Sequence, residues 1–234
     1  MHCSGLAIAG LSGISCFLTK IGHAYLSLAA QNWSALSGFL AANWQELAGS
    51  LTGALCVWLL IRQNIWNWPV GIANNIFYIV VFYKSGLFAD MGVQFVYIAV
   101  AIYGWWNWLH GGIDHSELKV ARASAMGWLG YTALALAGTG VLYWLLHRFT
   151  PSTVPFMDGL TSALFLTAQY MMSRKLVENW WFWIVGDVLV IGLYIYKHLY
   201  LTSVLYLIFL AMSVAALVEW QRAAQRVRTA EASA

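Results

Sequence analysis

Two stretches of this chain, residues 62–84 and 175–197, repeat one pattern at a fixed offset of 113 positions. Both stretches are almost wholly apolar, and polar residues recur at matching places within them. The matched pairs are Arg62 with Lys175, Asn74 with Asp187, and Tyr83 and Lys84 with Tyr196 and Lys197. Such an offset indicates a helical unit that is built twice, with a polar residue at the same depth of the same helix in each copy.

The composition places these stretches in a membrane. Hydrophobic residues make up 61% of the chain and charged residues 9%, and the mean hydropathy is +0.68, whereas an average soluble domain has about 25% charged residues. A helix needs about 20 apolar residues to cross the hydrocarbon layer, and anchoring side chains at its ends let a shorter run suffice. Seven apolar runs are predicted to span: residues 46–62, 66–83, 88–109, 126–147, 158–173, 179–197 and 200–219.

The order of these runs predicts an all-α integral membrane protein with seven transmembrane helices in a 3+1+3 arrangement. Three spans leave the chain on the opposite side of the membrane, so one unpaired span lets the second unit repeat the orientation of the first. The two three-helix repeats are therefore predicted to be parallel. The predicted segments are an N-terminal segment with a membrane-associated helix (1–44), the first three-helix repeat (45–110), a loop and linker transmembrane helix (111–157), the second three-helix repeat (158–221) and a cytoplasmic tail (222–234).

The distribution of Lys and Arg predicts the orientation. With seven spans, one side of the membrane carries eight of the twelve basic residues and the other carries four. The side with more basic residues faces the cytoplasm, which places the C-terminus inside. An eighth span within residues 21–42 is the alternative that changes this count.

Polar side chains inside the predicted spans are the candidates for a binding site. Asp187 is the one carboxylate deep in an apolar run, and its burial without a partner would cost several kcal/mol, so it needs a partner or a water-filled cavity. Repeat-built membrane proteins commonly bind cargo between the repeats, so a transporter is the first hypothesis. A plainer interpretation is that the amides bond neighbouring helices and the tryptophans anchor span ends. The candidates are Asn74, Asn75, Gln94, Trp180, Trp183 and Asp187.

Three motifs resemble the PnuC family of bacterial nicotinamide riboside transporters, and the likeness covers roughly residues 45–221. Gln94 follows the first of these motifs. Asn67 and Trp105 lie within the motifs and complete the candidate substrate-binding set. The motifs are Trp-Asn-Trp-Pro-Val-Gly-Ile-Ala-Asn-Asn at residues 66–75, Tyr-Gly-Trp-Trp-Asn-Trp at 103–108 and Arg-Lys-Leu-Val-Glu-Asn-Trp-Trp-Phe-Trp at 174–183.

The resemblance implies a fold related to the SWEET sugar transporters and a homotrimer in the bacterial inner membrane. It also implies facilitated diffusion of nicotinamide riboside, with trapping inside the cell by a nicotinamide riboside kinase. A cationic pyridinium ring with a carboxamide and a ribose suits aromatic, amide and carboxylate side chains. No Lys or Arg lies well inside a predicted span, which favours the riboside over a phosphorylated nucleotide.

Other interpretations remain. Proton-coupled transport through Asp187 is one, and the same fold carrying thiamine, riboflavin or a sugar is another. A membrane enzyme is disfavoured because the sequence lacks the H-E-x-x-H, G-x-S-x-G and Walker patterns. Cys3, Cys16 and Cys56 have no metal-type spacing, so no metal site is predicted. No cofactor or nucleic-acid partner is predicted either.

Overall fold

The computed structural model describes residues 33–84, 88–150, 152–196, 198 and 200–233. Within these residues the chain is all-helical, with one isolated β-bridge between Ala121 and Leu176. Residues 1–32, which hold most of the predicted N-terminal segment, lie outside the described part. The elements are α2 (Trp33–Ile61), α3 (Asn67–Lys84), α4 (Phe88–His110), the 3₁₀ helix η1 (Ile113–His115), α5 (Ala125–Phe149), α6 (Pro155–Ser173), α7 (Asn179–Tyr196) and α8 (Tyr200–Ala232).

Local chemistry explains several helix ends. Between α2 and α3, Gln63 adopts a left-handed backbone with φ 53°, and the Asn64 side chain accepts a hydrogen bond from the Trp66 amide at 2.9 Å. Ser124 caps α5 by accepting from the Gly127 amide at 3.1 Å, as N-cap hydroxyls do. Pro155 stands in the first turn of α6, where its missing N–H costs no helical hydrogen bond.

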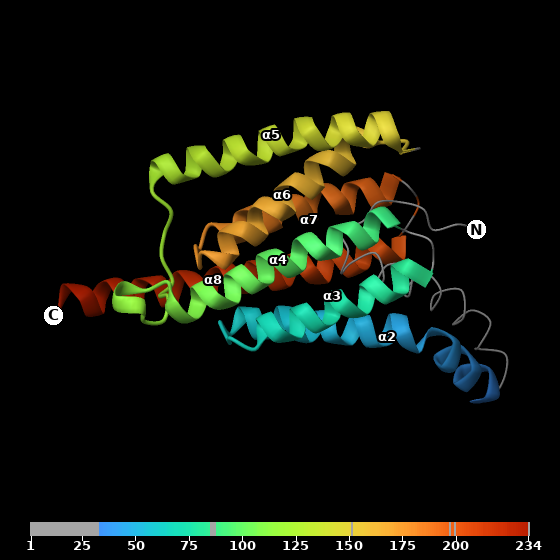
Figure 1. The fold of residues 1–234 in the computed structure, drawn as a ribbon, viewed down its shortest axis with the longest axis horizontal. Coiled ribbons are helices and arrows are strands. Elements are labelled where there is room, and N and C mark those ends of the chain that lie inside the picture. Colours follow the sequence, from blue (N-terminus) through green and yellow to red (C-terminus); the bar gives the residue numbers. More distant parts are fainter. Residues whose placement is uncertain (1–32, 85–87, 151, 197, 199, 234) are drawn as a thin grey trace.

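Helices that follow one another in sequence pack side by side. In Figure 1, α2, α3 and α4 form one group, α5, α6 and α7 form another, and α8 runs along the length of the molecule between them. The groups are joined by contacts of α4 with α6 and by α8, which packs on both α7 and α2. α5 packs along α6 at the edge of the bundle, so a large part of its apolar surface stays exposed.

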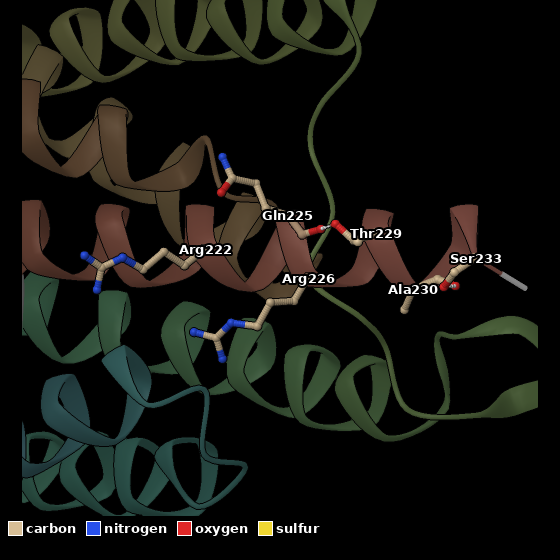
Figure 2. A pocket seen from close by; sticks show the side chains of 6 residues that line it. All are labelled: Arg222, Gln225, Arg226, Thr229, Ala230 and Ser233. Atoms are coloured by element: carbon tan, nitrogen blue, oxygen red, sulfur yellow. Dashed lines mark hydrogen bonds between the residues drawn. The ribbon is translucent and has the colours of Figure 1, made fainter.

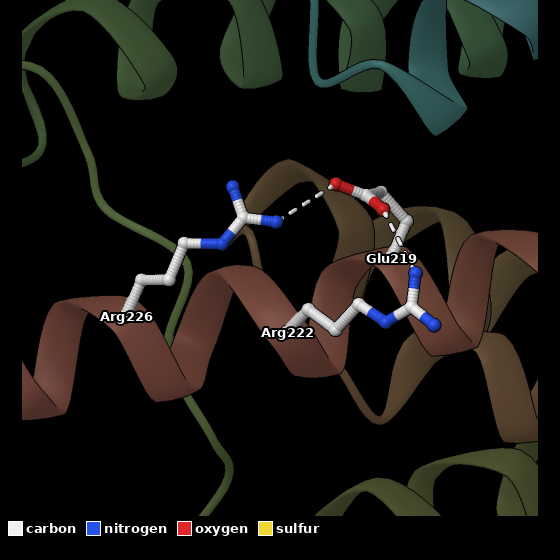
Figure 3. A network of polar contacts seen from close by, with 3 residues as sticks. All are labelled: Glu219, Arg222 and Arg226. Carbon is white, nitrogen blue, oxygen red and sulfur yellow. Dashed lines mark hydrogen bonds and ion pairs between the residues drawn. The ribbon is translucent and has the colours of Figure 1, made fainter.

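Two helices are longer than the apolar pattern predicts. α2 begins at Trp33 instead of residue 46, and α8 continues to Ala232, so residues 222–232 of the predicted tail are helical. The chain has no Gly or Pro after Gly192 to end α8. Glu219 also pairs with Arg222 at 4.0 Å and with Arg226 at 3.4 Å along one face (Figure 3), an arrangement that supports an exposed helix.

Three helices of the described chain are long and apolar enough to cross a membrane: α5, α7 and residues 206–230 of α8. The sequence analysis predicts seven spans. α3 and α6 carry buried polar residues such as Asn67, Asn74 and Thr167, which lower their mean hydropathy. In a bundle these polar groups face neighbouring helices instead of lipid, so a hydropathy criterion alone passes over such helices.

Gly186 lets α7 lie close to α6. A Cβ atom at this position would lie 2.5 Å from Cε1 of Phe165, which is completely buried. Gly192 lies on the same helix, but a Cβ atom there would have no neighbour within 4 Å.

Gly186→Ala is therefore expected to destabilise the fold by about 1–3 kcal/mol through overpacking, seen as a lower thermal unfolding midpoint in detergent. Gly192→Ala is the matched control and should leave the midpoint unchanged or raise it. Equal midpoints for the two variants would contradict the close packing of α7 against Phe165.

Candidate functional site

A cavity of about 190 Å³ lies where the two helix groups meet. Six helices contribute to its wall, and α5 does not. Ligand sites of small molecules usually measure about 300–1,000 Å³, so this cavity is compact. The lining residues are Gly53, Cys56, Val57, Leu60, Asn67, Trp68, Gly71, Asn74, Asn75, Tyr97, Ala101, Gln169, Met172, Trp180, Trp183, Asp187, Phe209 and Ser213.

Most of the candidates from the sequence line this one cavity, namely Asn67, Asn74, Asn75, Trp180, Trp183 and Asp187. Gln94 and Trp105 do not line it. Trp105 is 38% exposed on α4. Gln94 is completely buried, and within the described chain its amide nitrogen and oxygen have no hydrogen-bond partner. It stands about one turn along α4 from Tyr97, which does line the cavity.

Asp187 supplies the only carboxylate of the cavity wall as described, and no Lys or Arg stands among those lining residues. The side chain is 2% exposed, and its Oδ2 accepts a hydrogen bond from the Ser213 hydroxyl of α8 at 3.1 Å. A single neutral donor does not balance a buried negative charge. The cavity therefore suits a ligand that carries positive charge.

Tryptophans of the cavity wall offer hydrogen-bond donors. The indole N–H groups of Trp68, Trp180 and Trp183 are buried, and none has a partner within the described residues. Two other buried tryptophans differ, since Trp108 donates to the Met172 carbonyl at 3.0 Å and Trp220 to the Leu60 carbonyl at 3.2 Å. Buried donors are nearly always paired, so the three cavity N–H groups are suited to oxygen atoms of a ligand or of water.

Asn74 has a structural role as well. Its amide nitrogen donates to the Gly49 carbonyl at 2.8 Å and to the Thr52 hydroxyl at 2.6 Å, both on α2. The amide nitrogen is thus committed to joining α3 to α2. The plainer interpretation from the sequence, an amide that bonds a neighbouring helix, applies to this half of the side chain.

Several lining residues were not among the sequence candidates: Cys56, Trp68, Tyr97, Gln169 and Ser213. One signal was available, because Gln169 follows Cys56 by the same 113 positions that separate Asn74 from Asp187. Trp68 belongs to the first Trp-rich motif. Tyr97 and Ser213 have no polar counterpart at that offset.

A second hollow lies along the exposed C-terminal part of α8 and is lined by Arg222, Gln225, Arg226, Thr229, Ala230 and Ser233 (Figure 2). Its lining comes from α8 and from Ser233, the residue that follows this helix. It lacks the enclosing walls that bury most of a small ligand, and it stands apart from the candidate residues.

A comparison with known protein families matches the part of the chain that contains the cavity. A profile of the family described as nicotinamide mononucleotide transporter matches residues 43–222. The chain belongs to this family, which includes the PnuC proteins. Residues 43–222 contain all eight candidate binding residues and every residue that lines the cavity.

Similar proteins have vitamin-transport names. The nicotinamide riboside transporter PnuC of Escherichia coli (strain K12) is 25% identical over 71% of this chain and 80% of its own length. The riboflavin/roseoflavin transporter RibM of Streptomyces davaonensis is 26% identical over 81% of this chain and 92% of its own length. A crystal structure of the vitamin B3 transporter PnuC superimposes with a TM-score of 0.60 and 25% identity, covering 95% of this chain and 94% of that one.

Asn74→Ala is expected to lower the free energy of unfolding by about 0.6–1.7 kcal/mol, because interhelical hydrogen bonds in membrane proteins contribute about that much. The measurement is thermal unfolding in detergent. Asn75→Ala, a change at the neighbouring position, is the control and should have a smaller effect. An unchanged unfolding midpoint for Asn74→Ala would contradict a stabilising role of its two hydrogen bonds to α2.

Proposed function

We propose that this protein carries nicotinamide riboside across the bacterial inner membrane by facilitated diffusion. The observation that carries the proposal is the buried Asp187 carboxylate, set among tryptophans in a cavity whose described lining has no basic residue. A cationic aromatic ring meets both requirements of such a wall, because it balances the charge and stacks on the indole faces.

The remaining groups of the riboside also find counterparts. Its carboxamide and ribose hydroxyls present oxygen atoms, and the three indole N–H groups of Trp68, Trp180 and Trp183 are donors without partners in the described chain. Asn67 and Asn75 add amide groups to the same wall. We expect Trp180, Trp183 and Asp187 to contact the nicotinamide ring and Trp68 to contact an oxygen of the cargo.

The cavity favours the riboside over the mononucleotide. Strong recognition of a phosphate usually employs Arg or Lys side chains, and the described lining offers neither. Asp187 would also repel the phosphate. The family description names the mononucleotide, whereas the PnuC relatives are named for the riboside, and the chemistry of the wall supports the second of these.

Riboflavin is the second candidate, since RibM is a relative of similar identity. The flavin ring system is uncharged and tricyclic. The compact cavity of about 190 Å³ and its carboxylate both favour the smaller cationic cargo.

The proposed mechanism is alternating access. In this proposal α2–α4 and α6–α8 are two parallel repeats in a 3+1+3 arrangement, and α5 is the linker span. The repeats rock about cargo held between Asn74 and Asp187, which the 113-residue offset pairs. We further propose a homotrimer with cytoplasmic C-termini, and trapping of the cargo by an intracellular nicotinamide riboside kinase.

Calorimetry on the purified protein tests the cargo. Nicotinamide riboside is expected to bind, with the mononucleotide, thiamine and riboflavin at least tenfold weaker. Asp187→Asn keeps the shape of the side chain but removes its charge, and should weaken riboside binding about tenfold or more, since a buried charge pair is commonly worth over 1.4 kcal/mol. Glu219→Gln removes an acid outside the cavity and should bind as the wild type does. Tighter binding of riboflavin than of nicotinamide riboside would contradict the riboside proposal and indicate riboflavin as the cargo.

Flux measurements in proteoliposomes test the driving force. Uptake of riboside should follow its own gradient and reach the external concentration, with no accumulation when a proton gradient is imposed. Accumulation that requires the proton gradient, and disappears in Asp187→Asn while exchange continues, would establish the proton-coupled alternative instead.

A further inference from the structure

Four buried tryptophans pack together beside the cavity. Trp68, Trp108, Trp180 and Trp220, here called the inner cluster, are each at most 2% exposed. The Trp108 ring meets the Trp68 ring edge-on at a centroid distance of 5.4 Å and lies tilted against the Trp220 ring at 5.9 Å. The Trp180 ring meets the Trp220 ring edge-on at 5.5 Å. Trp68 and Trp180 also line the cavity, so the inner cluster separates the cavity from the end of the bundle where α4 and α6 end.

Two hydrogen bonds tie the inner cluster to helices on either side, one from α4 to α6 and one from α8 to α2. The Trp108 indole of α4 donates to the Met172 carbonyl near the end of α6 at 3.0 Å. The Trp220 indole of α8 donates to the Leu60 carbonyl near the end of α2 at 3.2 Å. Any motion that separates α4 from α6, or α8 from α2, at this end must break these contacts.

A segment between α4 and α5, residues 117–123, covers the inner cluster and is here called the strap. The Leu118 amide donates to the Trp108 carbonyl at 2.9 Å, and the Ala121 amide donates to the Lys175 carbonyl at 3.1 Å. The Ala123 amide donates to the Glu178 carboxylate at 2.7 Å. Val120 of the strap is 5% exposed and packs in the same hydrophobic core as the four tryptophans.

Lys175 joins the strap to the inner cluster. Its ammonium lies 4.4 Å from the centroid of the Trp108 ring and donates to the Leu118 carbonyl at 2.8 Å. Burial lowers the pKa of this lysine, and the nearby Glu117 carboxylate acts in the opposite direction. The residue has φ 55°, a left-handed conformation that is costly for a non-glycine residue and persists where surrounding contacts enforce it.

We propose that the inner cluster is the gate between the cavity and the face that bears the C-terminus, and that Lys175 is the residue that locks it. Lys175 is a positioning residue, because it acts on the cavity through Trp108 and Trp68 instead of touching the cargo. The term gate rests on the proposed transport function. Whether the inner cluster controls access to the cavity can be measured without knowing the cargo.

Cys56 provides a reporter inside the cavity. It lines the wall, its Sγ donates to the Asn67 carbonyl at 3.2 Å, and it is the one cysteine in the described residues. Replacing Cys3 and Cys16 by Ser leaves Cys56 as the sole thiol of the chain. A charged, membrane-impermeant maleimide applied to one face of sealed vesicles then measures how often the cavity opens toward that face.

The experiment compares the labelling rate of Cys56 from each face, without cargo. In the Lys175→Met variant, labelling from the face with the C-terminus should rise about tenfold, and labelling from the other face should not rise. Lys175→Arg keeps a cation over Trp108 and should stay close to the wild-type rate. Arg122→Met removes the same charge from an exposed position of the strap and should stay within twofold of wild type.

The proposal is overturned if Lys175→Met labels at the wild-type rate from that face, or if Arg122→Met accelerates labelling equally. A variant that fails to fold would label rapidly from both faces and lose its thermal transition. In that event the test uses Trp108→Phe, which keeps a ring beside Lys175 but loses the hydrogen bond to Met172. Faster labelling of Cys56 from the face with the C-terminus alone would support the gate, and an unchanged rate from that face would overturn it. Since no cargo is present, failure here is distinguishable from failure of the proposed function.

Discussion

The interior of this bundle depends on how a largely apolar chain accommodates polar groups away from water. Several buried hydroxyls, such as those of Thr139 and Thr167, bond a carbonyl of their own helix, and other polar groups are paired between helices: Asn74 bonds α2, Trp108 bonds α6 and Trp220 bonds α2. Three indole N–H groups that lack partners in the described chain line one cavity together with the Asp187 carboxylate, whereas the unpaired amide of Gln94 and the side-chain oxygen of Asn179 lie outside its lining. Unsatisfied polar groups are costly in an apolar medium, and the presence of several in one cavity is the reason that we propose it as the binding site.

Tryptophan serves two purposes that its N–H groups distinguish. In Trp108 and Trp220 the N–H bonds a carbonyl of another helix, and the ring belongs to the proposed gate. In Trp68, Trp180 and Trp183 the N–H has no described partner, and the ring forms the cavity wall. Trp68 and Trp180 also contact Trp108 and Trp220, respectively. These ring contacts connect the proposed gate to the cavity wall.

The sequence predicted the all-helical class and the starts of six of the seven long helices to within a few residues, because apolar runs of helix length are recognisable in a sequence. It also predicted six residues that line the cavity, because polar residues stand out within apolar runs. It missed Ser213 and Tyr97, since a hydroxyl in an apolar run looks the same whether it faces a cavity or a backbone carbonyl. The lengths of α2 and α8 were wrong because their additional turns are more polar. The contact of Lys175 with Trp108 depends on a left-handed backbone in a turn, which residue spacing does not encode.

Protection of Cys56 tests the central claim, that cationic nicotinamide riboside occupies the cavity beside Asp187. With Cys56 as the sole thiol, saturating riboside should slow its alkylation in the purified protein by tenfold or more. Nicotinamide mononucleotide at the same concentration should give little protection, and protection by the riboside should be lost in Asp187→Asn. Alkylation that is unaffected by riboside under conditions where binding is measured would place the cargo elsewhere and contradict this account.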